Sequence, residues 1–323
     1  MVTREVTTDE TSGAPTSSAG QATPSRVDPV FIVGSPRSGT SAFAWALAQH
    51  KLLVTGPESD FLYYLLKGGP KSPLRQVYLQ GVETPAGLKG RWLQSHEVAW
   101  DEFASHAGQG FASLFASRTN GSRWIDSSPS NTLVVEDLLL MFPSSRFVHV
   151  LRDGRAVVSS MIASSFPVKF ASSFTNACET WSLYAAKAHA FCQAHPECSW
   201  EVRNEDWSAD AEGELRKVFT SLDVDYDDRA EKFLMKKRIN SSFDAGAGAE
   251  APATKAAPVK DKSHVWTAWT SRQKRTFLDI AGETMERLGY DQALDHLWRS
   301  GVLGYCGVKP IRIELLLDAA FDT

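Results

Sequence analysis

The chain has 323 residues, of which 43% are hydrophobic, and a formal net charge of −4 at pH 7 with basic and acidic side chains intermixed. This hydrophobic share is enough to build one substantial core, and the balanced charge argues against a protein that binds nucleic acid or an anionic membrane surface. The four cysteines have neither the close spacing of a metal site nor the density of a secreted disulfide scaffold. We therefore expect one main domain with reduced thiols and no metal.

Residues 1–27 are rich in Thr, Ser, Ala and Pro and lack the apolar core of a signal peptide. The chain also contains no run of eighteen apolar residues. The sequence therefore predicts a flexible N-terminal tail over residues 1–27, no transmembrane segment and a cytoplasmic location.

Short apolar runs alternate with helical patterns after the tail. The expected strands are Val30–Val33, Arg123–Asp126, Arg146–Leu151 and Cys198–Arg203, and the expected helices are Gly39–His50, Leu133–Met141, Ala156–Ser164 and Thr175–His195. This alternation predicts an α/β fold with a parallel β-sheet flanked by helices on both faces. Ligands of such sheets bind at the carboxyl ends of the strands.

The first strand leads into a turn of small residues, Gly34-Ser35-Pro36-Arg37-Ser38-Gly39-Thr40-Ser41, just before a helical pattern. Backbone N–H groups of such a turn, and the positive end of the following helix, bind an anion above the strand end. Thr40 stands where a P-loop nucleoside triphosphatase needs its lysine, and the cation lies in the turn as Arg37. The pattern predicts a P-loop-type anion site but argues against ATP or GTP hydrolysis. Taken alone, it is also compatible with an ordinary strand-to-helix connection.

A second strand-to-helix segment carries Arg152-Asp153-Gly154-Arg155 directly after the strand that ends at Leu151. Ser160 follows Arg152 by eight residues, about two turns into the helix, so the guanidinium and the hydroxyl can converge on one phosphate. Taken singly, these residues also fit the solvated start of a helix.

Together the two segments resemble the sulfotransferases that use 3'-phosphoadenosine 5'-phosphosulfate (PAPS). The residues Arg37–Ser41 and Arg152–Arg155 with Ser160 match that family in identity, order and spacing. The resemblance continues through Trp124–Pro129, Trp200–Trp207 and Leu288–Tyr290, and it looks most like the bacterial branch that also resembles tyrosylprotein sulfotransferases. It implies a sulfotransferase domain over residues 28–290, followed by a C-terminal extension over residues 291–323.

The resemblance implies a cofactor site that holds PAPS and releases 3'-phosphoadenosine 5'-phosphate (PAP). Residues implied to bind the 5'-phosphosulfate are Arg37, Ser38, Gly39, Thr40 and Ser41; Arg152, Ser160 and Lys262 are implied near the 3'-phosphate, and Trp266 near the adenine. Arg37 would also stabilise charge on the departing phosphate oxygen. Trp266 and Trp269, three residues apart, are equally compatible with a helix that packs into the core.

Glu58 follows Arg37 by twenty-one residues, the interval at which tyrosylprotein-type relatives place their catalytic glutamate. A partly buried carboxylate with a raised pKa can accept the proton of an attacking hydroxyl, so Glu58 is the candidate base. Alternatively, Glu58 is an acid that is favoured at the N-terminus of a helix. In that case Asp60 or a histidine such as His264 would be the base.

The sequence departs from the family pattern at two positions. Ser127 replaces a lysine that many relatives place between sulfate and leaving oxygen, and Asn204 replaces a tyrosine close to the adenine. Lys262 is a candidate substitute for the lysine. It ends the segment 244–262, whose Gly- and Ala-rich composition predicts a mobile loop, either a plain linker or a lid over the nucleotide.

These observations predict a PAPS-dependent sulfotransferase that modifies a hydroxyl of a small-molecule, lipid or natural-product acceptor by in-line displacement. No metal is required, and the chain is compatible with a homo-oligomer. Two alternatives stay open at this point. One is a metal-dependent nucleotide kinase of the P-loop class, and the other is a cofactor-binding protein whose catalysis is impaired by the missing lysine.

Overall fold

A computed structural model describes residues 28–83, 91–164, 172–236 and 265–290. The predicted N-terminal tail, the segment 244–262 with Lys262, the competing base His264 and the C-terminal extension lie outside the described residues.

Five parallel strands form the centre of the protein. They are β1 (Val30–Val33), β2 (Leu53–Thr55), β3 (Arg123–Asp126), β4 (Arg146–Leu151) and β5 (Ser199–Arg203), in the order β2-β3-β1-β4-β5. The predicted parallel sheet is therefore confirmed, with β1, β3 and β4 at their expected bounds and β5 one residue shorter. The sequence did not predict β2, because three residues are too few to show a periodic pattern.

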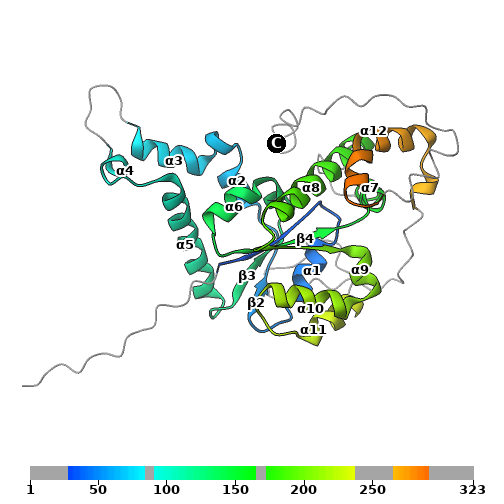
Figure 1. Cartoon of the computed structure of the whole chain (residues 1–323), viewed down its shortest axis with the longest axis horizontal. Helices are drawn as coiled ribbons and strands as arrows, with labels where there is room; N and C mark the ends of the chain where they lie inside the picture. Colours follow the sequence, from blue (N-terminus) through cyan, green and yellow to red (C-terminus); the bar gives the residue numbers. More distant parts are fainter. Residues whose placement is uncertain (1–27, 84–90, 165–171, 237–264, 291–323) are drawn as a thin grey trace, which may run out of the picture.

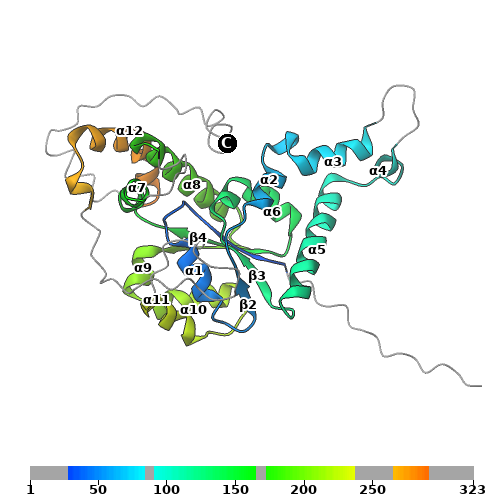
Figure 2. The same ribbon diagram turned by 180° about the vertical axis from the view of Figure 1, so that it is seen from behind.

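Twelve helices and three short 3₁₀ turns surround the described sheet (Figures 1 and 2). The α-helices are α1 (Thr40–Leu47), α2 (Phe61–Leu66), α3 (Pro73–Val82), α4 (Trp92–Ser95), α5 (Trp100–Arg118), α6 (Val135–Met141), α7 (Gly154–Ile162), α8 (Phe174–Ala194), α9 (Asn204–Ala209), α10 (Ala211–Ser221), α11 (Asp228–Lys236) and α12 (Ser271–Arg287). The 3₁₀ turns are η1 (Gly69–Lys71), η2 (Pro129–Val134) and η5 (Val265–Ala268). None of these helices is long and apolar enough to cross a membrane.

Helices cover both faces of the sheet because successive strand residues point to opposite sides. On β1, Val30 and Ile32 join the core beneath α1, α10 and α11, whereas Phe31 and Val33 join the core beneath α6 and α8. All four side chains are fully buried, as expected for a central strand of a parallel sheet. Figure 1 shows the two helical layers on either side of the sheet and α3, α4 and α5 beyond its β2 edge.

The last described helix, α12, packs along α8 and lies close to α7. A third core cluster joins Trp181 of α8 to Phe277 and Met285 of α12 and to Val157 of α7. Ser182 of α8 also lies within hydrogen-bonding distance of Thr284 of α12, with 2.7 Å between the hydroxyl oxygens. This packing fixes the position of α12 beside the second predicted anion-binding segment.

Gly34 allows the chain to turn sharply at the end of β1. Its φ angle is +141°, and a Cβ added there would lie 2.6 Å from the carbonyl oxygen of Val150 on the neighbouring strand. That oxygen belongs to the backbone of the central sheet and cannot move aside. A side chain at position 34 would therefore strain the backbone and also clash with the adjacent strand.

We predict that Gly34→Ala lowers the free energy of unfolding by about 3 kcal/mol, the sum of typical costs for backbone strain and overpacking. Urea denaturation measures the effect as a lower midpoint with an unchanged m-value. Gly56→Ala is the control, because a Cβ at that position has no neighbour within 4 Å. Equal midpoints for the two variants would contradict the prediction.

Candidate functional site

The turn between β1 and α1 is tightly curled and leads directly into the N-terminus of α1. Arg37 and Gly39 have φ angles of +71° and +105°, so the backbone curls before α1 begins at Thr40. The N-cap residue is Gly39, which has no side chain to cap the first N–H groups of the helix. Since the first N–H groups of a helix have no partners within the helix, those of α1 are suited to bind a ligand.

Two polar side chains from distant segments hold this turn. The N–H of Gly34 donates to Oγ1 of Thr132 at 2.8 Å, and the amide of Asn204 donates from Nδ2 to the carbonyl oxygen of Ser38 at 3.1 Å. A Cβ added to Gly39 would lie 2.8 Å from the same Asn204 nitrogen. Asn204 therefore contacts the turn directly. The sequence indicates only a departure from the family pattern at this position.

The second predicted segment lies next to the turn at the carboxyl ends of the strands, because β4 is the parallel neighbour of β1. Nη1 of Arg152 donates to the carbonyl oxygen of Arg37 at 3.1 Å, and Nε of Arg37 donates to Oγ of Ser160 at 3.3 Å. Burial and the nearby charge of Arg152 lower the pKa of Arg37, whereas Glu58 raises it. Two arginines and a hydroxyl are thus assembled in one place, which is a suitable environment for an anion.

Asp153 and Arg155 instead form the start of α7. Oδ1 of Asp153 accepts from the N–H of Arg155 at 2.8 Å, and the two side chains form an ion pair. Gly154 has no room for a side chain, since a Cβ there would lie 2.7 Å from the ring of Trp181. Within the predicted segment, Arg152 and Ser160 therefore face the turn, whereas Asp153 has the helix-capping role that the sequence left open.

Glu58 lies beside the turn that carries Arg37. Oγ of Ser41, in the first turn of α1, donates to Oε1 of Glu58 at 2.7 Å. Glu58 is partly buried and lies two residues before the competing base Asp60, which accepts a hydrogen bond from the hydroxyl of Ser130. The geometry thus brings Glu58 into direct contact with Ser41, at the end of the turn between β1 and α1, whose expected role is to bind phosphate.

The end of β3 supports the loop that carries Glu58. Oγ of Ser128 accepts from the N–H of Ser59 at 3.1 Å, and Oδ1 of the buried Asp126 accepts from the N–H of Ser128 at 2.8 Å. Burial raises the pKa of Asp126. The hydroxyl of Ser127 is buried and has no hydrogen-bond partner within the described part of the chain.

Trp266 and Trp269 have different surroundings, although they are three residues apart. The guanidinium of Arg155 lies 5.3 Å from the ring centroid of Trp266, which is half-buried in η5. Trp269 packs against Phe174 and Phe277, with ring centroids 4.9 Å and 5.2 Å away. Trp266 therefore lies next to the second segment, and Trp269 belongs to the core.

The buried histidine of β4 forms a polar cluster of its own. Nδ1 of His149 lies 3.0 Å and Nδ1 of His189 lies 2.8 Å from the same carboxylate oxygen of Glu201. Burial lowers the pKa of His149. Burial alone would raise the pKa of Glu201, but the hydrogen bonds from both histidines lower it to about 2.

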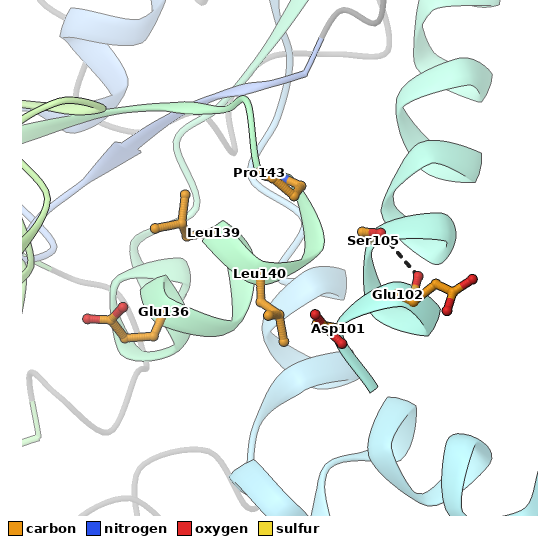
Figure 3. Close-up of a pocket in the computed structure, with 7 residues that line it drawn as sticks. All are labelled: Asp101, Glu102, Ser105, Glu136, Leu139, Leu140 and Pro143. Atoms are coloured by element: carbon orange, nitrogen blue, oxygen red, sulfur yellow. Dashed lines mark hydrogen bonds between the residues drawn. The ribbon is translucent and has the colours of Figure 1, made fainter. Parts of the chain in front are cut away.

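No group of three or more His, Cys, Asp or Glu side chains in the described ranges could hold a metal ion. A groove of about 490 Å³ between α5 and α6 contains none of the predicted site residues (Figure 3). Its lining includes the carboxylates of Asp101, Glu102 and Glu136. These negative charges disfavour an anionic cofactor in the groove.

Two known proteins are similar to the chain in sequence. It is 24% identical over 215 residues to an uncharacterised protein of Aquifex aeolicus, covering 65% of this chain and 27% of that protein. It is 23% identical over 200 residues to a Caenorhabditis briggsae protein that carries the provisional name protein-tyrosine sulfotransferase, covering 61% of this chain and 66% of that protein. The chain thus spans about a quarter of the first relative and just under two thirds of the second.

Solved structures of sulfotransferases are also similar to the chain. A sulfotransferase domain from the curacin biosynthetic pathway aligns with a TM-score of 0.49 and 17% identity, covering 80% of this chain and 98% of that domain. The mouse sulfotransferase SULT7A1, complexed with PAP, aligns with a TM-score of 0.46 and 12% identity, covering 86% of this chain and 90% of that protein.

The family model described as "Sulfotransferase family" matches residues 29–228. This span is more than half of the chain and includes Arg37, Glu58, Arg152 and Ser160. The chain therefore belongs to the sulfotransferase family, as its two anion-binding segments predicted.

Proposed function

We propose that this protein transfers the sulfuryl group of PAPS to a hydroxyl of a small-molecule, lipid or natural-product acceptor. The observation that best supports this function is the convergence of two segments 115 residues apart, in which Arg152 bonds to the backbone of Arg37 and Arg37 bonds to Ser160. PAPS carries a 3'-phosphate and a 5'-phosphosulfate. A site with two arginines and a helix N-terminus matches both of these anionic groups in charge and in donor type.

The two segments have separate roles in the proposed donor site. The backbone N–H groups of Gly39 and Thr40, with the hydroxyls of Thr40 and Ser41, bind the 5'-phosphosulfate. The N–H of Ser38, also expected there from the sequence, donates instead to the carbonyl oxygen of Ser35 at 3.1 Å. Arg152 and Ser160 bind the 3'-phosphate. Trp266 lies beside Arg155, three residues after Arg152 in the sequence, and this position supports a contact between its ring and the adenine.

In the proposed reaction, the acceptor oxygen forms a bond to sulfur while the bond between sulfur and the 5'-phosphate oxygen breaks. Glu58 takes the proton of the acceptor hydroxyl, and Arg37 stabilises the negative charge that develops on the departing phosphate oxygen. The 2.7 Å bond between Ser41 and Glu58 supports these roles, because it places the base beside the phosphate turn. The products are the sulfated acceptor and PAP.

An apolar acceptor is favoured by the elements next to Glu58. Helix α2, with the sequence Phe-Leu-Tyr-Tyr-Leu-Leu, begins three residues after Glu58. Most of the neighbouring aromatics pack against one another, as Phe115 and Trp124 do with ring centroids 4.0 Å apart. Tyr64 of α2, however, is 46% exposed and is available to contact an acceptor.

The donor site is tested first by calorimetric titration with PAP, with and without magnesium. We expect tight binding to the wild type that does not depend on magnesium, and binding at least about tenfold weaker for Arg152→Ala, because a hydrogen bond to a charged group contributes ~1.5–3 kcal/mol. Arg216→Ala is the control, since Arg216 pairs with Glu212 on the exposed surface of α10. Binding of ATP alone, and only with magnesium, would instead favour a nucleotide kinase.

The base is tested by Glu58→Gln, with an acceptor identified by mass-spectrometric screening of phenols, sterols and glycolipids. We expect kcat to fall by about 10²–10⁴, as for loss of a general base, while PAP binding changes little. Asp60→Asn is the comparison, and a larger loss in that variant would assign the base to Asp60. A wild-type protein that binds PAP but sulfates none of the acceptors would favour the binding protein with impaired catalysis.

A further inference from the structure

The peptide group between Arg152 and Asp153 is held on both sides by side chains. Its carbonyl oxygen accepts a hydrogen bond from Nε1 of Trp181 at 3.1 Å, and its N–H donates to Oε1 of Glu205 at 2.9 Å. A peptide group is planar and rigid, so two bonds on its opposite edges fix its orientation. The direction in which the Arg152 side chain leaves the backbone is thereby fixed as well.

The pairing of the strands brings Glu205 to this position. In the parallel register of β4 and β5, Leu151 is the partner of Arg203, so Asp153 and Glu205 each lie two residues beyond the last paired residues. Asn204, between Arg203 and Glu205, holds the carbonyl oxygen of Ser38 in the phosphate turn. Adjacent residues after β5 therefore contact both anion-binding segments.

Tyr290 restrains the second oxygen of the same carboxylate. Its hydroxyl donates to Oε2 of Glu205 at 3.1 Å. Arg203 stacks on the ring of Tyr290, with 4.7 Å between the guanidinium carbon and the ring centroid, and also donates to the carbonyl oxygen of Leu288. Glu205 is exposed, and an exposed glutamate samples several rotamers unless bonds at both oxygens hold it.

The end of α12 is shaped to present Tyr290. Gly289 has a φ angle of +73°, its N–H donates to the carbonyl oxygen of Glu286 at 2.9 Å, and the N–H of Tyr290 donates to that of Met285 at 2.8 Å. These two bonds and the left-handed glycine form a Schellman motif. The motif ends the helix and turns the chain so that Tyr290 reaches Glu205.

We propose that Glu205 is a positioning residue for Arg152 and that Tyr290 orients Glu205, so that the Leu288-Gly289-Tyr290 segment contributes to donor binding without touching the donor. This inference rests on the proposed function. Electrostatics alone makes the opposite prediction, because a carboxylate near a phosphate site repels the ligand. Removal of the carboxylate would then strengthen PAP binding, whereas loss of positioning weakens it.

The experiment combines PAP titration with amide hydrogen exchange on the full chain. We expect Glu205→Ala to weaken PAP binding about tenfold and Tyr290→Phe to weaken it about threefold, fold-changes typical of a lost hydrogen bond. Glu205→Gln should stay close to the wild type, since its amide oxygen can still accept from the N–H of Asp153. In the absence of ligand, exchange of the Asp153 amide should be faster in Glu205→Ala than in Glu205→Gln.

Tyr226→Phe is the matched control. The hydroxyl of Tyr226 donates to a carboxylate oxygen of Glu231 at 3.0 Å, which is the same kind of bond at almost the same length, but in the layer formed by α10 and α11. Both substitutions remove one bond from tyrosine to glutamate. Only Tyr290→Phe should change the affinity for PAP.

The possible results separate this inference from the proposed function. If the wild type binds PAP and Glu205→Ala binds it equally well or more tightly, the positioning role is wrong and the sulfotransferase site stands. Equal losses of affinity in Tyr226→Phe and Tyr290→Phe would also overturn the positioning role, because they would reflect general destabilisation. Failure of the wild type to bind PAP would overturn the proposed function, and this role with it.

Discussion

The site depends on two like charges held close together. Arg37 is partly buried and lies next to Arg152, and both burial and the second guanidinium lower the pKa of Arg37. Such an arrangement is unfavourable for the protein by itself, because neither charge is fully solvated and the two repel each other. The backbone offsets this cost, since Arg152 donates to the carbonyl oxygen of Arg37 and is thereby kept in place. The nearby charge of Glu58 acts in the opposite direction and raises the pKa of Arg37. In the proposed function, a bound dianion would offset the repulsion between the two guanidinium groups further.

The parallel sheet makes this arrangement possible. Because β1 and β4 are neighbours in the order of strands and run in the same direction, the turn after Val33 and the residues after Leu151 leave the sheet at the same edge. The strand on the other side of β4 then adds Asn204 and Glu205 at that edge. The segments that follow β1, β4 and β5 thus supply the turn, the second arginine and the residues that hold them.

The sequence predicted those strands and turns that depend on residues close together along the chain. The strand β1 is an apolar run that ends at a turn, and β4 is a mainly apolar segment that ends just before Arg152. Arg37 follows in the turn after β1. Glu58 is a candidate base because of an interval taken from the family resemblance, and that interval does not predict its contact with Ser41. No local pattern predicts the bond from Asn204 to Ser38 or from Tyr290 to Glu205, because these residues are 166 and 85 positions apart and show no periodicity.

The two tryptophans near the end of the domain show why spacing alone was insufficient. A separation of three residues places side chains on one face of a continuous α-helix, which made a shared core position a reasonable interpretation. Trp266 lies instead in the short 3₁₀ turn η5, and Trp269 follows that turn just before α12 begins at Ser271. The change of backbone geometry between them sends one ring to Arg155 and the other into the core.

The bond between Ser41 and Glu58 gives the proposed chemistry an order. The hydroxyl of Ser41 donates to the carboxylate of Glu58. A hydroxyl has a single proton to donate, so it cannot serve the carboxylate and a phosphosulfate oxygen at the same time. In the proposed function, a donor that attracts this proton would release the Glu58 carboxylate from its hydrogen bond with Ser41, and the carboxylate could then accept a hydrogen bond from the acceptor hydroxyl. Binding of the donor would therefore prepare the base for the acceptor hydroxyl.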